Sequence, residues 1–402
     1  MTAAQPHQPP PARFRIVDLF AGPGGLDLAA KILGLGTVGV EWDDDACKTR
    51  RAAGLPTVHD DVRNYGPDSE QVREANVLAG GPPCQTFTVA GSGTGRKALD
   101  LVLYLVRKLC AAQNVSDLDI VVKEAEGFED ERTALVLQPL KWALEAYFLG
   151  RPYEAIILEQ VPSVLPVWEA VGEVLEKIGY KFPSADQADD DDVLPLSLDG
   201  HHRSRRMLGP SPRAFVLRTE EYGVPQTRRR AVLLARLGEQ PRFPAPTHRR
   251  YRKGVPESEG PPALEPWVSM AKALGREDEF VVVSNYGTGG DPKARGRRDS
   301  TAPSATVTGK ISRNRLETCD GKDLGRFTSE EAGQLQSFPR QYPWRGGDIA
   351  QQIGNAIPPR LGVHILSAAL GLEAPTQNVW DRLENWSPDE PSGDGRSPSE
   401  SQ

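Results

Sequence analysis

The 402-residue chain has only four cysteines, and their spacing excludes two common roles of this residue. Cys47, Cys84, Cys110 and Cys319 form no C-x-x-C pair, so neither a disulfide framework nor a zinc site is indicated, and no metal site is expected. No run approaches about 18 consecutive apolar residues, which argues against a membrane-spanning helix. The proline-rich N-terminus also lacks the apolar stretch of a signal peptide. We therefore expect a cytoplasmic protein that has no membrane partner.

Charge is distributed unevenly along the chain. Hydrophobic residues make up 38% and charged residues 26% of the sequence, which is typical of a globular protein. The formal net charge is −7, yet residues 201–315 carry 23 Lys and Arg against 11 Asp and Glu. Such a basic region is either a solvated surface or a face that binds a polyanion, where arginines neutralise phosphates.

Short apolar runs alternate with helical patterns in the first part of the chain. We predict strands at 15–20, 37–40, 77–79 and 155–158, and a helix at 24–33 directly after the first strand. Strand, turn, helix and strand in this order are typical of a doubly wound parallel sheet. The sequence therefore predicts an α/β fold.

Changes in composition divide the chain into domains and tails. We predict a disordered tail at 1–13, a first domain at 14–235, a smaller second domain at 236–325, a return to the first domain at 326–374 and a second disordered tail at 375–402. Within the first domain we expect insertions at about 92–126 and 183–213. The second insertion contains His201 and His202, which have no partner at helical spacing, so we interpret it as a loop and not as a metal site.

Three segments that follow predicted strands indicate a nucleotide pocket. D-L-F-A-G-P-G-G-L begins at Asp18, and its glycines let the backbone approach a ligand, although this pattern alone fits a structural turn equally well. The second strand ends at Glu41, which can accept both ribose hydroxyls, and the adjacent Trp42 can stack on a purine. Asp61 can accept a hydrogen bond from the adenine amino group. Together these segments predict an adenosine pocket at the carboxyl ends of the strands.

A second group of residues indicates nucleophilic catalysis at the same edge of the sheet. G-G-P-P-C-Q holds Cys84 on a rigid Pro-Pro turn as a candidate nucleophile, although a core cysteine is equally compatible with this segment alone. The strand at 155–158 brings Glu159 close to that thiol. Further along, Q-T-R-R-R places Arg228 and Arg230 on one face if the segment is extended.

Seven ordered motifs resemble those of the DNA (cytosine-5-)methyltransferase family. They are D-L-F-A-G-P-G-G-L at Asp18, E-W-D at Glu41, G-G-P-P-C-Q at Gly80, E-Q-V at Glu159, Q-T-R-R-R at Gln226, R-F-T-S-E-E-A-G-Q-L-Q-S-F-P at Arg326 and Q-I-G-N-A-I-P-P at Gln352. They span about 14–370, nearly all of the chain that we expect to be ordered. One departure is Gln160, where the family usually has Asn.

The resemblance implies a Rossmann-like S-adenosylmethionine-dependent methyltransferase sheet with a target-recognition domain at 236–325. It implies transfer of a methyl group from S-adenosylmethionine to C5 of a flipped-out cytosine in double-stranded DNA, through a covalent bond between Cys84 and C6. S-adenosylhomocysteine is the implied product. Glu159 is implied to act at N3 and the exocyclic amine, and Arg228 and Arg230 at the O2 side of the base.

The resemblance also implies the cofactor-binding residues and the partners. The implied cofactor-binding residues are Asp18, Phe20, Ala21, Gly22, Gly24, Gly25, Leu26, Glu41, Trp42, Asp61, Pro83 and Asn355. The implied partners are double-stranded DNA and a cognate restriction endonuclease system, with the enzyme itself a monomer.

Three alternatives stay open at this point. One branch of the family methylates tRNA, but its Cys-Phe-Thr signature does not occur in this sequence. A nicotinamide-dependent oxidoreductase would explain the glycine-rich opening and leave the P-P-C-Q and Q-I-G-N segments unexplained. An inactive DNA-binding relative would not need Cys84, Glu159 and both arginines.

Overall fold

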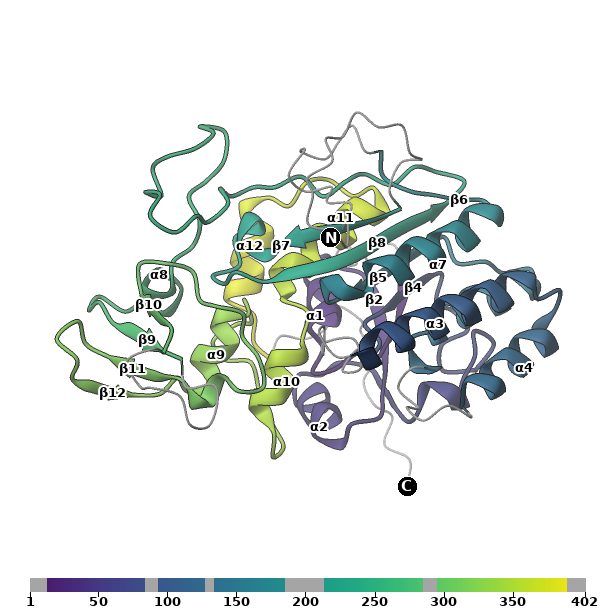
Figure 1. Cartoon of the computed structure of the whole chain (residues 1–402), viewed down its shortest axis with the longest axis horizontal. Helices are drawn as coiled ribbons and strands as arrows, with labels where there is room; N and C mark the ends of the chain where they lie inside the picture. Colours follow the sequence, from purple (N-terminus) through teal and green to yellow (C-terminus); the bar gives the residue numbers. More distant parts are fainter. Residues whose placement is uncertain (1–12, 84–92, 127–133, 185–212, 285–294, 389–402) are drawn as a thin grey trace, which may run out of the picture.

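The structure is a computed structural model that describes residues 13–83, 93–126, 134–184, 213–284 and 295–388. Two sheets organise these residues, a large one in the first domain and a small one in the second (Figure 1). Among the described helices, none is both long and apolar enough to cross a membrane.

The large sheet has a parallel half and an antiparallel half. Its strands are β1 (Arg15–Leu19), β2 (Gly36–Glu41), β3 (Thr57–His59), β4 (Val77–Gly80), β5 (Ala155–Gln160), β6 (Tyr180–Lys181), β7 (Ala214–Arg218) and β8 (Arg229–Leu237). The order is β3-β2-β1-β4-β5-β8-β6, with β7 also paired to β8. The strands from β3 to β5 are parallel, as predicted, whereas β8 runs antiparallel to β5, β6 and β7. This antiparallel half was not among the features predicted from the sequence.

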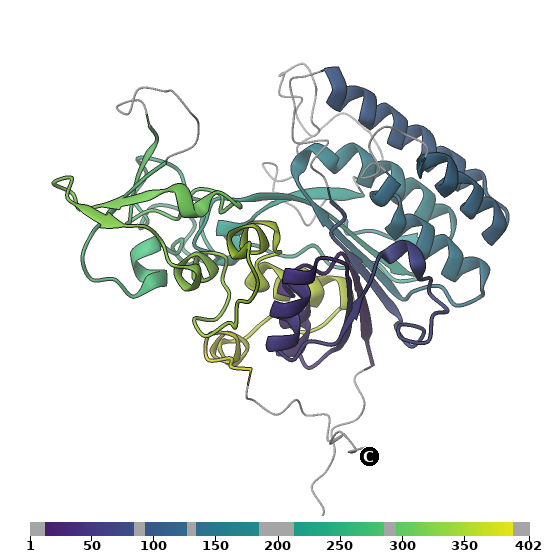
Figure 2. The same cartoon turned by 90° about the horizontal axis from the view of Figure 1, so that it is seen from below.

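Helices cover both faces of the large sheet (Figure 2). One face carries α1 (Gly25–Ile32) and α11 (Pro359–Leu370), which pack against each other, and α12 (Gln377–Glu384) contacts α1. The other face carries α3 (Gly93–Ala111), α4 (Val115–Glu126), α6 (Gln138–Phe148) and α7 (Leu165–Lys177). Alternate residues of each central strand enter the two cores, so Ile157 packs with the α1 side and Leu158 with the α3 side. Helix α2 (Asp44–Ala52) follows β2.

The segment predicted as an insertion at about 92–126 is part of the main core. Helix α3 packs against α7 and α4, and Val102, Leu105 and Leu109 of α3 are buried in the same cluster as Leu158 of β5. These helices therefore form the crossover between parallel strands β4 and β5, which must pass over one face of the sheet. The predicted loop at 183–213, with His201 and His202, lies almost wholly outside the described residues.

The small sheet is antiparallel and belongs to the second domain. Its strands are β9 (Val281–Val283), β10 (Arg297–Asp299), β11 (Arg315–Glu317) and β12 (Asp323–Gly325), in the order β10-β9-β11-β12. Helices α8 (Met270–Leu274) and α9 (Ser329–Leu335) pack against each other next to it, and α10 (Ile349–Asn355) contacts α9 and α2. The chain thus leaves the first domain after β8 and returns to it through α9 and α10.

The expectation of a disordered tail from residue 375 is wrong for residues 377–388. Helix α12 forms there, and Trp380, Leu383 and Trp386 are buried. The three side chains recur at spacings of three residues and so share one side of the segment. The residues around this short apolar stripe are mostly polar, and for this reason the segment was predicted to be disordered.

The C-terminal segment supports the glycine-rich loop after β1. The ring of Trp386 lies 5.5 Å from that of Tyr342, and the Tyr342 hydroxyl donates a hydrogen bond of 2.5 Å to the carbonyl of Pro23. We predict that Trp386→Ala lowers the free energy of unfolding by about 3 kcal/mol, because a large buried ring is removed. Arg382→Ala, at an exposed position of α12, is the matched control in a denaturant titration. Equal stability of the two variants would contradict this packing.

Two histidines are buried, His364 of α11 and His248 of the segment after β8. His364 is 5% exposed and contacts Tyr222 and Trp380 with ring centroids 5.1 Å away. Burial, together with the positive charge of Arg360, lowers the pKa of His364 to about 3. The same causes lower the pKa of His248 to about 4. Both imidazoles are therefore neutral in the folded protein at neutral pH.

These lowered pKa values predict a loss of stability in acid. Below about pH 6.5 an unfolded histidine takes up a proton, whereas folded His364 does not until about pH 3. The contribution of each neutral histidine to the free energy of unfolding is thus fully present above pH 6.5 and is lost as the pH drops towards 3. For each histidine, the folding equilibrium constant falls by at most about tenfold per pH unit. His364→Phe is expected to flatten this dependence in thermal unfolding scans between pH 7 and 4. The exposed His59→Gln serves as control and should leave the dependence unchanged.

Candidate active site

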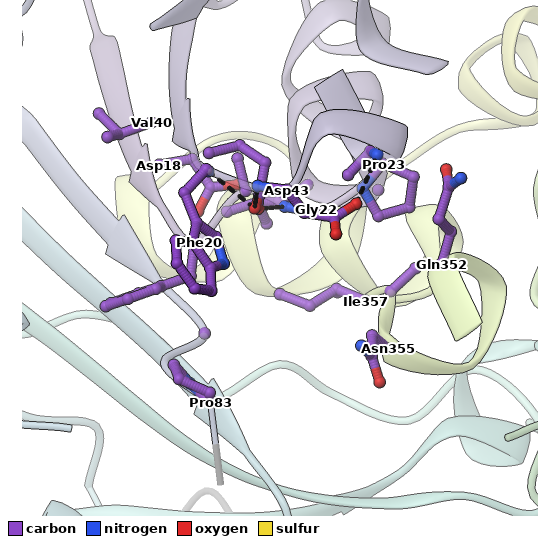
Figure 3. Close-up of a pocket in the computed structure, with 18 of the residues that line it drawn as sticks. Asp18, Phe20, Gly22, Pro23, Val40, Asp43, Pro83, Gln352, Asn355 and Ile357 are labelled. Atoms are coloured by element: carbon purple, nitrogen blue, oxygen red, sulfur yellow. Dashed lines mark hydrogen bonds between the residues drawn. The ribbon is translucent and has the colours of Figure 1, made fainter. Parts of the chain in front are cut away.

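A cavity of about 660 Å³ lies at the carboxyl ends of the parallel strands (Figure 3). Residues after β1, β2 and β4 line it, together with the end of β5, the start of β8 and the turn after α10. This volume lies in the range of small-molecule sites, and the edge of the sheet is where α/β folds bind ligands. Asp18, Glu41, Trp42 and Asp61 line the same cavity as Glu159, so the predicted cofactor and base sites are continuous.

The loop after β1 has an unusual backbone. Phe20 and Gly22 have φ of 62° and 55°, and Gly24 has φ of 99°. A left-handed Phe is strained, and such strain concentrates at functional sites. A Cβ on Gly25 would lie 2.0 Å from the carbonyl oxygen of Ile357, so only glycine allows the turn after α10 to pack here.

Six of the seven residues of this loop that were predicted to bind the cofactor line the cavity. Asp18, Phe20, Ala21, Gly22, Gly25 and Leu26 line it. Gly24 does not, because it faces the side chains of Leu55 and Tyr342. Its positive φ sets the turn into α1, and its contact with the cofactor stays a prediction.

Glu41 is held rigidly at the end of β2. One carboxylate oxygen accepts a hydrogen bond from Gly22 N at 2.7 Å, and the other accepts from Trp42 N and Asp43 N at 2.9 and 2.8 Å. Burial raises the pKa of Glu41, and these three N–H groups oppose that rise. A carboxylate has about four acceptor positions, so one stays available for a ligand hydroxyl.

The outer end of the cavity combines an exposed ring with acidic groups. Trp42 is 70% exposed, which leaves an indole face open for stacking. The Asp61 carboxylate lines the cavity and accepts hydrogen bonds from Arg63, at 2.9 Å to the backbone N and 2.6 Å to the guanidinium. Asp61 is therefore fixed in place, and its contact with adenine stays a prediction.

A buried charge cluster lies beneath the loop after β1. Arg50 of α2 forms an ion pair of 2.6 Å with Asp27, and both side chains are completely buried. Burial and the neighbouring Asp27 raise the pKa of Asp18 well above its usual value. Arg50 also contacts the carbonyls of Ala21 and Pro56, so it ties the loop to β3. The sequence offers no periodicity or motif that would have revealed Arg50.

Glu159 and Arg230 meet at the inner end of the cavity. Arg230 Nε lies 2.6 Å from a Glu159 carboxylate oxygen, and the side chains are 10% and 6% exposed. Burial raises the pKa of Glu159, whereas the charges of Arg230 and Arg228 lower it. The proximity of Glu159 and Arg230 depends on the antiparallel pairing of β5 with β8.

Arg228 also lines the cavity, but its guanidinium contacts backbone carbonyls. It donates hydrogen bonds to Val307 at 2.9 Å, Gly354 at 2.9 Å and Ala356 at 3.3 Å. Burial lowers its pKa well below the usual value. The structure therefore separates the two arginines that the sequence grouped together, since only Arg230 forms an ion pair with Glu159.

Cys84 lies outside the described residues, and the chain before it is described as far as Pro83, which lines the cavity. The side-chain amide of Gln160 donates to the carbonyl of Pro82 at 2.5 Å, and its oxygen accepts from Val161 N at 2.6 Å. The residue that departs from the family pattern therefore anchors the segment that leads to Cys84.

The turn after α10 closes the cavity. Asn355 lines it as predicted, and its side-chain oxygen accepts a hydrogen bond of 2.7 Å from Gln351. Gln352 accepts from Thr49 of α2 at 2.7 Å and donates to the carbonyl of Arg345 at 2.7 Å. Sequence reasoning did not single out Gln351, although its position four residues before Asn355 on a helix puts the two side chains on one face.

These features fit S-adenosylmethionine. The cavity offers an open indole at Trp42 for a purine, a carboxylate with one acceptor position at Glu41 for a ribose, and a strained loop at 20–25 for the amino-acid end. The donor set is therefore that of a nucleoside carrying a charged tail.

An α/β sheet with a ligand cavity at its strand ends and a small antiparallel sheet is compatible with an S-adenosylmethionine-dependent methyltransferase. The model of the family described as C-5 cytosine-specific DNA methylase matches residues 14–113. The type II methyltransferase M.PspPI of Psychrobacter sp. (strain TA137) is 25% identical over 391 residues, which cover 92% of this chain and 83% of that protein. M.Eco47II of Escherichia coli is 25% identical over 368 residues, covering 87% and 76%.

Solved structures agree in fold. The Dnmt2 methyltransferase of S. pombe aligns with a TM-score of 0.54 at 16% identity, over 89% of this chain and 99% of that one. The family model and the sequence relatives support a C5-methyltransferase family for this chain.

The geometry at Glu41 predicts the effect of a nearly isosteric change on cofactor binding. In the natural chain, three backbone N–H groups donate to the Glu41 carboxylate. In Glu41→Gln, the side-chain NH₂ group faces one or two of these donors and cannot accept their hydrogen bonds. We expect the affinity for S-adenosylhomocysteine to fall by about tenfold or more, because a buried donor loses its acceptor. Calorimetric titration measures this, with Asp44→Asn, an exposed neighbour outside the cavity, as control. An unchanged affinity in Glu41→Gln would refute the role of Glu41.

Proposed function

We propose that the chain methylates cytosine at C5 in DNA with S-adenosylmethionine as the methyl donor. The observation that carries this proposal is the single cavity that joins the Glu41–Trp42 end to the Glu159–Arg230 pair. A donor and a pyrimidine bound in this cavity would meet without crossing solvent. The named relatives are type II methyltransferases, which supports action on DNA within a restriction–modification system.

Cytosine C5 is too weak a nucleophile to accept a methyl group unaided. We assign the activation to Cys84, which follows Pro82 and Pro83 at the end of β4. Its thiolate adds to C6, and the electron pair of the C5–C6 double bond moves towards C5 and the ring. Gln160 supports this role because its hydrogen bond to Pro82 fixes the approach to the nucleophile.

Glu159 and Arg230 are the groups that stabilise the charge from this addition. We assign Glu159 to N3 and the exocyclic amine, and burial, which raises its pKa, favours the sharing of a proton between its carboxylate and N3. Arg230 keeps the Glu159 carboxyl in position through their ion pair and directs positive charge to the O2 side. No described side chain is assigned to remove the C5 proton, and we propose that a water or hydroxide takes it.

The cofactor supplies an electrophilic methyl group when it is bound. Glu41 would hold its ribose, Trp42 its adenine ring and the loop at 20–25 its amino-acid end. After methylation at C5, loss of the C5 proton and departure of the Cys84 thiolate from C6 restore the aromatic ring. The reaction therefore leaves the cysteine unchanged.

The target base must leave the duplex to reach this cavity. The Glu159–Arg230 pair is 6% and 10% exposed, so a stacked base cannot reach it, and we infer that the nucleotide is flipped out. The second domain with the small sheet is the proposed reader of the surrounding sequence, and its arginines can bind guanine edges or phosphates. A monomeric enzyme and a cognate endonuclease also stay proposals.

Bisulfite sequencing of DNA from cells that express the chain tests this function. We expect methylated cytosines at one defined sequence. Cys84→Ala should abolish methylation, with a rate loss of about a thousandfold or more as expected for a covalent nucleophile, while affinity for S-adenosylhomocysteine is retained. The exposed Cys319→Ala is the matched control and should stay active.

Substrate class and covalent chemistry can be tested together. A duplex that contains 5-fluorocytosine should form a stable adduct with the natural chain, because fluorine at C5 blocks the elimination step, and should form none with Cys84→Ala. Transfer of methyl groups to tRNA and not to DNA, or an adduct formed by Cys84→Ala, would falsify the assignment.

A further inference from the structure

A buried polar network joins the second domain to the cavity. Gln226, Arg228 and Gln336 are its side chains, with exposed fractions of 0%, 2% and 0%. Gln226 donates to Gln336 at 2.5 Å and accepts from Val307 N at 2.8 Å. Gln336 donates to the carbonyl of Ile353 at 2.6 Å. The network therefore contacts the segment that leaves the small sheet, the end of α9 and the turn after α10.

Arg228 is the member of this network that bridges both sides. One of its terminal nitrogens donates to Val307, in the segment after β10, and the other donates to Gly354 and Ala356. The latter two residues flank Asn355, which lines the cavity. The Nε of Arg228 has no hydrogen-bond partner among the described residues. A planar guanidinium can span two backbone segments in this way, whereas a lysine ammonium is a point charge.

The two bridged segments also touch each other directly. Thr227 N donates to the carbonyl of Ser304 at 2.8 Å, which fixes the start of the segment beside Arg228. At the end of the segment 304–309, Gly309 packs closely against α10. A Cβ on Gly354 would lie 2.3 Å from Gly309 N, and a Cβ on Gly309 would lie 2.1 Å from the side-chain oxygen of Gln351. Gln351 in turn donates to Asn355. Neither segment can shift without moving the other, since the two backbones are in close contact with no free space between them.

We propose that Arg228 is a positioning residue that couples the occupancy of the second domain by DNA to the cofactor cavity. This inference rests on the proposed function and replaces the expected contact of Arg228 with the O2 side of the base. DNA that binds to the small sheet shifts the segment at 304–309, and Arg228 transmits this shift to the C-terminal end of α10, where Asn355 lies. By reciprocity, a bound cofactor then raises the affinity for DNA by the same factor.

Calorimetric titration of S-adenosylhomocysteine, with and without DNA, measures this coupling. The DNA probe is a short duplex that carries the sequence methylated by the chain, as mapped by bisulfite sequencing. We expect DNA to tighten S-adenosylhomocysteine binding by about fivefold or more in the natural chain. In Arg228→Lys, which keeps the charge but cannot bridge both segments, we expect less than about twofold tightening. Affinity without DNA should stay within about threefold of the natural chain.

A second variant and a control keep the test independent of folding at position 228. Gly309→Ala leaves Arg228 intact and presses on Gln351 from the side of the second domain, so it should reduce the coupling as well. Arg229→Lys changes the exposed neighbour and should retain full coupling. A merely structural role of Arg228 would lower stability and both affinities without selectively removing the effect of DNA.

Steady-state kinetics separate positioning from contact with the base. We expect Arg228→Lys to raise the KM for S-adenosylmethionine by about fivefold or more while kcat changes by less than about threefold. A large fall in kcat at unchanged KM, full coupling in Arg228→Lys, or no coupling in the natural chain would overturn the proposal. Failure of the proposed function is distinct from these outcomes, because it would appear as absent methylation or absent S-adenosylhomocysteine binding in the natural chain.

Discussion

The ion pair between Glu159 and Arg230 is the constraint around which the site is built. A carboxylate that is almost fully buried needs a nearby cation or several hydrogen-bond donors, because burial strongly disfavours an isolated charge. Glu159 ends the parallel strand β5, and Arg230 begins β8, which runs in the opposite direction. The antiparallel half of the sheet therefore brings a cation to the edge where the parallel strands end.

The cofactor end of the cavity follows a similar rule with backbone groups in place of a cation. Three N–H groups hold the Glu41 carboxylate, one from the loop after β1 and two from the start of α2. Arg50 and Asp27 fix the same loop from beneath, and Tyr342 fixes it from the C-terminal part of the chain. Distant segments thus converge on one loop whose backbone is strained at Phe20. The rigidity of the surrounding contacts maintains that strain.

The second domain shares the interior of the first. Gln226, Arg228 and Gln336 are buried where the two domains meet, and the turn with Asn355 lies between them and the cavity. A junction made of fully buried polar groups has few alternative arrangements, since each group that loses its partner stays desolvated. Such a junction suits a protein whose two ligands must be bound together before reaction.

The sequence by itself determined the parallel half of the sheet and most residues of the cavity. Strands and glycine-rich turns are local patterns, and parallel strands carry the residues at their carboxyl ends to one edge, so Asp18, Glu41 and Glu159 could be placed at the cavity. Asn355, at the end of α10, was placed there only by the resemblance to a family. Only the tertiary structure decided the antiparallel pairing of β8, the ordering of α12, the buried Arg50 and the different environments of Arg228 and Arg230. These features depend on contacts between residues far apart in the chain, and such contacts leave no periodicity or spacing in the sequence.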